Sequence, residues 1–439
     1  MSGIKAFIIS GLILLFSENS YAENLTFSGY LKSYALAQDS ITIESMDSIN
    51  HDYTIAGNAQ SQNALRLMAS YISPEQGNFE LHYEVQPLYF SNTEFAESSG
   101  GLGATISIAN TQYRFKDFDA LMSEVGDNAV ILQNLDRLNY QYSNQYGDLT
   151  IGRQVLSFGS SRFINPTDIF IPFVIQTLNQ EYRVGIDAIR YTADLDDFSI
   201  LDMGVIIGED GKKQHSAAFL RTKNSIAGND IEFMAIALDD AWLLGGGLER
   251  AIGDFGFWFE TAFMRWQQKT VDNNLDNTAD KNLTLTHAPT LYTDDYWRTS
   301  VGSDYALNED VILMLEYHYN GAGSKDSSKY HELAQQAPYQ QAGVFLLGQH
   351  YLIPAVTWLA SPLMTINTSA FYNIDDRSIF INISSETSWS DNLYSDFGVF
   401  LTHGDNLQYQ LNGEQSQLKF TSEFGAYPLS IYASLRYYF

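Results

Sequence analysis

The sequence contains no cysteine, few basic residues for its length and no long apolar run beyond its first residues. Without cysteine, no disulfide can stabilise the fold. Only 24 Lys and Arg oppose 52 Asp and Glu, and the resulting net charge of −28 argues against nucleic-acid binding and against a polybasic membrane-surface protein. Beyond residue 22, no stretch approaches the roughly 18 consecutive apolar residues that a membrane-spanning helix needs.

Sequence signatures of catalysis are also missing. No G-x-S-x-G, H-E-x-x-H or phosphate-binding glycine loop stands out. The run Gly245-Gly246-Gly247 falls within a strand pattern, where it predicts a smooth wall or a bulge. His318 and His403 have no catalytic partner that the sequence identifies. We therefore expect no enzyme activity, no catalytic residues, no cofactor and no bound metal.

Residues 1–22 have the three parts of a cleaved secretory signal peptide. Lys5 supplies the positive charge, Ala6 to Phe16 form the apolar core, and Ser20-Tyr21-Ala22 form the small-x-small cleavage site. We expect export of residues 23–439 as a single domain. An exported chain without a spanning helix can cross a membrane only as a closed barrel, because lipid leaves open sheet edges without hydrogen-bond partners.

The segment 429–439 shows the clearest strand pattern in the chain. Its odd-numbered residues are apolar or aromatic, and most of its even-numbered residues are polar. Because side chains alternate between the two faces of a strand, one face suits hydrocarbon and the other suits water. At the usual tilt its length crosses a bilayer. A soluble edge strand is the alternative, but the closing Arg-Tyr-Tyr-Phe favours a membrane strand.

The same alternation recurs along the chain, joined by short and long connections in turn. This rhythm predicts an all-β fold, a transmembrane antiparallel up-and-down β-barrel of about eighteen strands, with sixteen as the alternative. Short periplasmic turns are expected at 74–77, 143–148, 194–198, 226–230, 252–255, 306–310, 360–362 and 388–392. Longer outer loops are expected at 37–62, 91–129, 267–291, 321–343 and 403–416. The many Tyr and Phe residues, 28 and 27, fit aromatic girdles at two lipid interfaces.

Two strands place ionisable residues on the face opposite their apolar residues. Glu80, His82 and Glu84 share one face of the third strand, and Glu316 and His318 share one face of the strand from Val311. Charged groups are costly in lipid, so these five are candidate lumen-lining residues. A metal site at 80–84 is the alternative, but neighbours on one strand face lie roughly 7 Å apart.

The segment 149–191 breaks the alternation. Arg153 shares the outward parity of Leu149 and Ile151, so either the strand bulges near Gly152 or Arg153 lies above the lipid. Asn165-Pro166-Thr167-Asp168 predicts a turn or helix start. The residues from Phe163 to Leu178 are too apolar for a water-exposed loop, which predicts that this connection folds into the barrel or packs on its rim.

This segment resembles porin-like and alginate-export-like outer-membrane barrels. Its match to their G-R-Q-x-x-x-x-G strand and the R-x-G-x-D-A-x-R strand that follows consists of Gly152, Arg153, Gln154, Gly159, Arg183, Gly185, Asp187, Ala188 and Arg190. The strand ending at Phe439 also resembles the closing strand of such barrels. That resemblance implies that Phe439 is an assembly signal read by the barrel-assembly machinery. Alginate itself is an improbable cargo, because its exporters use many basic lumen groups and this chain is acidic.

The charged residues of this segment have two interpretations. In the first, Arg–Asp pairs only pin an infolded loop to the wall. In the second, the same charges form a pore constriction that orients a polar solute. The candidate constriction residues are Arg153, Arg162, Asp168, Arg183, Asp187 and Arg190.

The sequence thus favours a porin-like channel in the cell outer membrane that passes small polar solutes by passive diffusion. A dedicated exporter or carbohydrate-specific channel shares the same barrel, and a barrel enzyme or an adhesin is a further alternative. The expected partners are outer-membrane lipid and lipopolysaccharide, the barrel-assembly machinery and the solute, with no nucleic acid. Three acidic loops, Glu44 to Asp52, Asp294-Asp295 and Asp375-Asp376, are expected to be solvated, with a bridging Ca²⁺ as the alternative.

Overall fold

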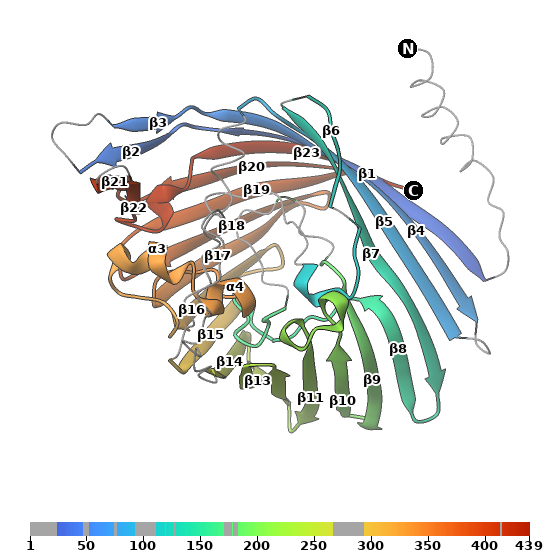
Figure 1. Cartoon of the computed structure of the whole chain (residues 1–439). Helices are drawn as coiled ribbons and strands as arrows, with labels where there is room; N and C mark the ends of the chain where they lie inside the picture. The colour runs from blue at the N-terminus through green and yellow to red at the C-terminus, as the bar shows by residue number, and fades with distance from the viewer. Residues whose placement is uncertain are drawn as a thin grey trace, which may run out of the picture.

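The computed structural model describes residues 24–46, 52–73, 77–92, 111–118, 120–126, 128–170, 178, 183–266, 294–412 and 415–439, without the side chains of 111 and 410–418. The predicted signal peptide lies outside these residues and stays a prediction. The described chain forms one large closed antiparallel barrel with a small second sheet at one end (Figure 1).

Eighteen strands form the closed ring, as the alternation predicted. Each pairs with its neighbour along the chain, and the last strand pairs with the first. The ring contains β1 (Leu25–Gln38), β4 (Asn58–Ser73), β5 (Gly77–Phe90), β7 (Ala129–Asn144), β8 (Gly147–Gln154), β9 (Ile186–Asp196), β10 (Ser199–Ile206), β11 (Ala217–Ile226), β12 (Asn229–Leu238), β13 (Ala241–Ile252), β14 (Phe255–Trp266), β15 (Tyr296–Ala306), β16 (Val311–Asn320), β17 (His350–Ser361), β18 (Met364–Asn373), β19 (Ile379–Ser390), β20 (Leu393–His403) and β23 (Ser430–Tyr438).

Seven of the eight predicted short turns are confirmed, and they lie at the same end of the barrel as the C-terminus; residues 74–76 of the eighth lie outside the described ones. The longer connections lie at the other end, where β12 and β13 are an exception because only two residues join them. Three of the predicted loops were wrong in part, since 91–129 contains the strand β6 (Leu121–Glu124) and the other two contain several strands. Residues 37–62 contain β2 (Ile41–Ser45), β3 (Tyr53–Ile55) and the start of β4, and residues 403–416 contain β21 (Leu407–Asn412) and the start of β22 (Gln415–Lys419).

These four short strands form the second sheet, in the order β22-β21-β2-β3. A further short strand, β6 (Leu121–Glu124), pairs with the upper part of β7. The described helices are single turns within the connections: η1 (Thr111–Tyr113), η2 (Glu209–Gly211), η3 (Lys213–His215), η4 (Ser327–Lys329), α3 (Tyr330–Leu333), α4 (Ala337–Gln341) and η5 (Phe424–Ala426). In the described part of the chain, no helix has the length and apolar character to cross a membrane.

The two faces of the wall differ sharply. Large apolar side chains project outward and are exposed, among them Phe27, Leu31, Leu220, Phe233, Leu244 and Leu315. The alternate positions, turned inward, are often polar and buried, such as Lys32, Arg66, Glu84, Glu232 and Glu260. An apolar band outside and polar groups inside are what a barrel in lipid requires.

The seam between β23 and β1 closes the ring. Tyr30 to Gln38 pair with Tyr438 to Ser430. The pairing continues to the last residue, since the Gly29 and Phe439 backbones exchange two hydrogen bonds of 2.9 and 3.0 Å. A Cβ on Gly29 would lie 2.7 Å from the Phe439 ring. The absence of a side chain at Gly29 therefore lets the Phe439 aromatic ring pack against β1.

We predict that Phe439→Ala lowers the yield of folded barrel, because the seam loses the ring packed on Gly29. The expected loss is about 1 kcal/mol of unfolding free energy for a half-buried aromatic. Heat-modifiable migration in SDS gels measures the folded fraction. Tyr437→Ala is the matched control, since that aromatic projects outward from the same strand. Equal losses in both variants would contradict a particular role for Phe439 in closure or assembly.

Candidate pore and its constriction

The connection from β8 to β9 folds into the barrel over residues 155–170. Leu156, Phe158, Ile169 and Phe170 are buried in one apolar cluster with inward side chains of β9 to β14. Pro166 and Thr167 form the predicted turn, with the Asp168 amide donating to the Asn165 carbonyl at 3.2 Å. The infolding expected from the apolar composition is thus observed for 163–170, and residues 171–177 lie outside the described ones.

Glu260 on β14 is the first anchor of this loop. One carboxylate oxygen accepts the backbone N–H groups of Ser160 and Ser161, at 2.8 and 3.0 Å. The other accepts the backbone N–H and the hydroxyl of Thr167, at 2.9 and 2.8 Å. The Glu260 side chain is almost completely buried. One wall residue therefore satisfies three loop amides that have left water.

Glu316 on β16 is the second anchor. It accepts the backbone N–H groups of Arg162, Phe163 and Ile164 at 2.9 to 3.3 Å. The indole of Trp258 donates to the same carboxylate at 2.8 Å. Two carboxylates on alternate strands thus hold two successive parts of the loop against the wall. Removing either would leave buried N–H groups without partners, which is costlier than the loss of an ordinary hydrogen bond.

Arg162 and Arg183 bring charge from the infolded connection into water. Arg162 is 45% exposed; its guanidinium lies 3.2 Å from Glu249 and 5.2 Å from the centre of the Trp258 ring. Arg183 is one-third exposed and pairs with buried Asp168 at 2.5 Å. These three are candidate constriction residues, and the structure brings them to the lumen side of the wall. Their constriction role stays a prediction.

Arg190 belongs to a row of ion pairs on the inner wall. It binds Asp202 on β10 through two hydrogen bonds of 2.8 Å. Arg221 on β11 follows, 2.7 Å from Glu232 on β12. The charges alternate from strand to strand, so each is neutralised by its neighbour. This row supports the wall-pinning interpretation for Arg190 more directly than the constriction interpretation.

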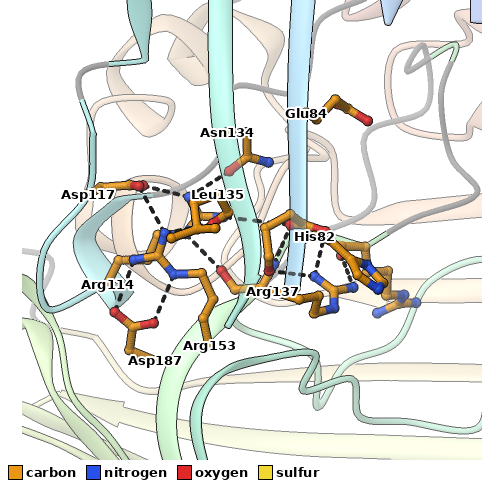
Figure 2. A network of polar contacts seen from close by, with 12 residues as sticks. His82, Glu84, Arg114, Asp117, Asn134, Leu135, Arg137, Arg153 and Asp187 are labelled. Atoms are coloured by element: carbon orange, nitrogen blue, oxygen red, sulfur yellow. Dashed lines mark hydrogen bonds and ion pairs between the residues drawn. The ribbon is translucent and has the colours of Figure 1, made fainter. Parts of the chain in front are cut away.

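Arg153 and Asp187 lie in the wall itself (Figure 2). Arg153 keeps the outward register, opposite Leu138 and Asp187, but a loop segment covers it. Its guanidinium contacts the Asp187 carboxylate at 2.8 Å and donates to the carbonyls of Leu135 and Lys116. The strand does not bulge near Gly152, so the observed register agrees with the other alternative, in which Arg153 keeps its outward position. The pair does not face the lumen, so the proposed constriction rests on the other four residues.

The reason for this arrangement is a gap in the wall. β8 ends at Gln154, whereas β7 continues upward to Ala129, so the upper part of β7 lacks a β8 partner. Residues 114–117 lie in this gap. Arginine side chains supply the missing donors: Arg153 to Leu135, Arg114 to the Gly185 carbonyl at 2.8 Å, and Arg137 to the Arg183 carbonyl at 2.7 Å.

Four residues of this network were not predicted from the sequence: Arg114, Asp117, Asp136 and Arg137. Asp136 accepts from Arg66, Arg137 and the Gly185 amide, so it is the central acceptor of the network. A bulge between β5 and β7 turns both Asp136 and Arg137 inward. The adjacent Asp136-Arg137 pair within an alternating strand was the available signal, because two successive charges cannot both face the lumen without a bulge.

The five candidate lumen-lining residues lie on the inner face of the wall. His82 contacts Glu80 at 3.0 Å, and Glu84 accepts from the Tyr30 hydroxyl. These contacts argue against a metal held by the three residues of β5. Glu316 holds the infolded loop, and buried His318 bonds Ser300, whose hydroxyl donates to the Ile164 carbonyl at 2.7 Å. Only Glu80, 39% exposed, presents substantial charged surface to water.

A second buried carboxylate cluster ties together the loops at the long-connection end. Glu423 is completely buried and accepts from the Tyr351 hydroxyl, the Leu347 amide and the Asn373 side chain. Its own amide donates to Asp376 at 2.7 Å. Asp375 accepts the amides of 349 and 350. The expectation of a simply solvated Asp375-Asp376 pair was therefore wrong, because both carboxylates are half-buried and hold backbone amides.

Comparisons with known proteins place the fold. No protein-family model matches the chain, and no curated protein matches it. Pseudomonas aeruginosa OccK5 (OpdH) aligns over 94% of this chain and 97% of its own, with a TM-score of 0.52 and 8% identity. Acinetobacter baumannii OccAB4 aligns over 95% and 98%, with a TM-score of 0.48 and 8% identity. A mutant of the Rh. blastica porin aligns over 94% of this chain and 100% of its own, with a TM-score of 0.41 and 9% identity. The likeness to OccK5 supports the barrel fold.

Loosening the infolded loop is expected to change conduction. We predict that Glu260→Gln and Glu316→Gln each raise single-channel current noise, and that together they raise the mean conductance severalfold. The amide places N–H groups against loop N–H groups and releases the loop from the wall. Planar-bilayer recordings measure both effects. Glu232→Gln removes an inward carboxylate that does not hold the loop; an equal effect there would show that charge alone was responsible.

The carboxylate cluster around Glu423 at the long-connection end is expected to respond to pH. Burial raises the pKa of Glu423 from 4.5 to about 7. The folded state therefore binds an extra proton between about pH 4.5 and 7, so the contribution of Glu423 to stability falls as pH rises through this window. We predict lower hydrogen-exchange protection factors for 420–427 at pH 8 than at pH 5. Glu423→Gln should remove most of this difference; an undiminished difference would assign it to other groups.

Proposed function

We propose that the chain is an outer-membrane channel through which small polar solutes diffuse passively. The observation that carries the proposal is the pairing of a closed eighteen-stranded barrel with a loop anchored inside it. A barrel of this size leaves an aqueous lumen unless something fills it. The loop fills part of the lumen next to β9–β16, where the apolar cluster lies.

The other side of the lumen supports passage of water and solute. Beside the seam, Glu386 on β19, 47% exposed, contacts Arg436 on β23, which also bonds Asp396 on β20 at 3.0 Å. Glu80 on β5 and Arg162 on the infolded loop add further exposed charge. Groups of both signs that remain in contact with water suit a polar solute and offer little to an apolar one.

The remaining parts of the proposal concern placement and partners. The exposed apolar band supports insertion in lipid, and residues 1–22 would direct export. Phe439, packed at the closing seam, would be read by the barrel-assembly machinery, and lipopolysaccharide would surround the outer half of the band. We propose transport without catalysis, with Arg162, Asp168, Arg183 and Arg190 as the candidate constriction.

The direct test is conductance of the purified barrel in planar bilayers. We predict stepwise opening of an ohmic pore, with a modest preference for cations at 0.1 M salt that fades at 1 M. The preference follows from the net charge of −28, most of which lies outside the paired wall residues. Charges at the mouth act over about 10 Å at 0.1 M and are screened at 1 M.

Three other outcomes would be informative. Absence of conductance would contradict a channel. Anion preference, or selectivity independent of salt, would show that the arginines of the infolded connection control the pore. In that case Arg162→Gln and Arg183→Gln should each shift the reversal potential, whereas Lys213→Gln, at an exposed position outside the ring, should not.

A further inference from the structure

An apolar groove of about 440 Å³ lies on the outer face of the wall, beside the gap above β8. Outward side chains of three adjacent strands line it: Leu135 and Leu138 on β7, Ile151 on β8 and Ile189 on β9. Leu138, Ile151 and Ile189 are among the exposed apolar residues of the barrel surface. The groove is therefore continuous with the band that faces lipid.

The groove has a ledge made by Phe115 and Lys116. The Phe115 amide donates to Asp187 at 2.9 Å, and Arg153 donates to the Lys116 carbonyl at 2.7 Å. Figure 2 shows the ion pair between Arg153 and Asp187, the two residues that make these contacts. The Arg153–Asp187 pair thus holds the ledge of Phe115 and Lys116 over strand surface that would otherwise be uncovered. This is a built recess, formed by a loop segment rather than by strand twist alone.

The charges around the groove differ in their availability. Arg153 is buried and bound to Asp187 and Asp117, so it has no free donor directed at a ligand. Lys116 is exposed at the groove, and no described carboxylate lies within ion-pair distance of it. An apolar recess with one unneutralised cation at its margin matches a hydrocarbon chain that ends in an anionic group.

We propose that this groove binds one acyl chain of lipid A, with a lipid phosphate at Lys116. The proposal rests on the proposed outer-membrane placement, because the groove lies toward the long-connection end and therefore in the outer leaflet. The occupant is a lipid rather than a solute, since the groove opens on the outer face of the wall. The bound chain covers a stretch of wall that side chains, rather than a strand ladder, hold closed.

The test uses the purified full-length barrel in mild detergent, titrated with diphosphoryl lipid A and examined by native mass spectrometry. We expect one retained lipid A per barrel, held in preference to phosphatidylcholine. Ile151→Trp should abolish this retention by filling the groove. Lys116→Gln should weaken it about fivefold, the usual effect of one interfacial basic residue.

Two matched variants serve as controls. Leu220→Trp places the same bulk on an exposed lipid-facing position of β11, and Lys213→Gln removes a lysine that is already paired with Asp239. Both should retain lipid A as the wild type does. Equal retention of phosphatidylcholine, or equal losses of lipid A in the two controls, would overturn the proposal. So would a barrel dimer without bound lipid, because a second copy of the chain would then cover the groove. Conductance is measured on the same preparations, so a barrel that conducts without retaining lipid fails this inference alone.

Discussion

The structure depends on one constraint: every backbone N–H and C=O that leaves water must find a partner inside the protein. Closing the ring between β23 and β1 meets this demand for the strands. The same demand explains both loop anchors, because the infolded backbone brings donors into a region without water. Glu260 and Glu316 each accept three of them. Polar wall residues thus have an architectural role before any role toward a solute.

Where the strand ladder fails, arginine replaces it. The upper part of β7 has no β8 partner, and guanidinium groups bond the carbonyls on both sides of this gap: Leu135 on β7, and Arg183 and Gly185 just before β9. A guanidinium suits this work because it offers five donors in a fixed plane and stays charged. Arg153 illustrates the result: it bonds two carbonyls and two carboxylates at once. The charges that looked functional in the sequence are here part of the wall.

The barrel could be predicted from the sequence because its signal is local and repeated. Alternation with period two and short turns gave the strand number and the turn positions, as at Ser143–Asp148 and Ser388–Asn392. The infolded loop was also visible, since its apolar residues needed cover. The anchors were not assigned to it, because Glu260 and Glu316 lie about 100 and 150 residues away in sequence. The second sheet was missed for the same reason: pairing between the first and last outer connections leaves no local pattern.

That second sheet joins the two ends of the chain above the seam. β2 pairs in parallel with β21, Ile43 opposite Leu407, while β1 and β23 pair below. The seam is therefore crossed twice, at two heights, by segments that are far apart in sequence. This arrangement dictates an order of events during folding, since β2 can pair with β3 early but with β21 only when nearly the whole chain is present. Completion of the second sheet is therefore a late step, because it needs both the first and the last outer connection.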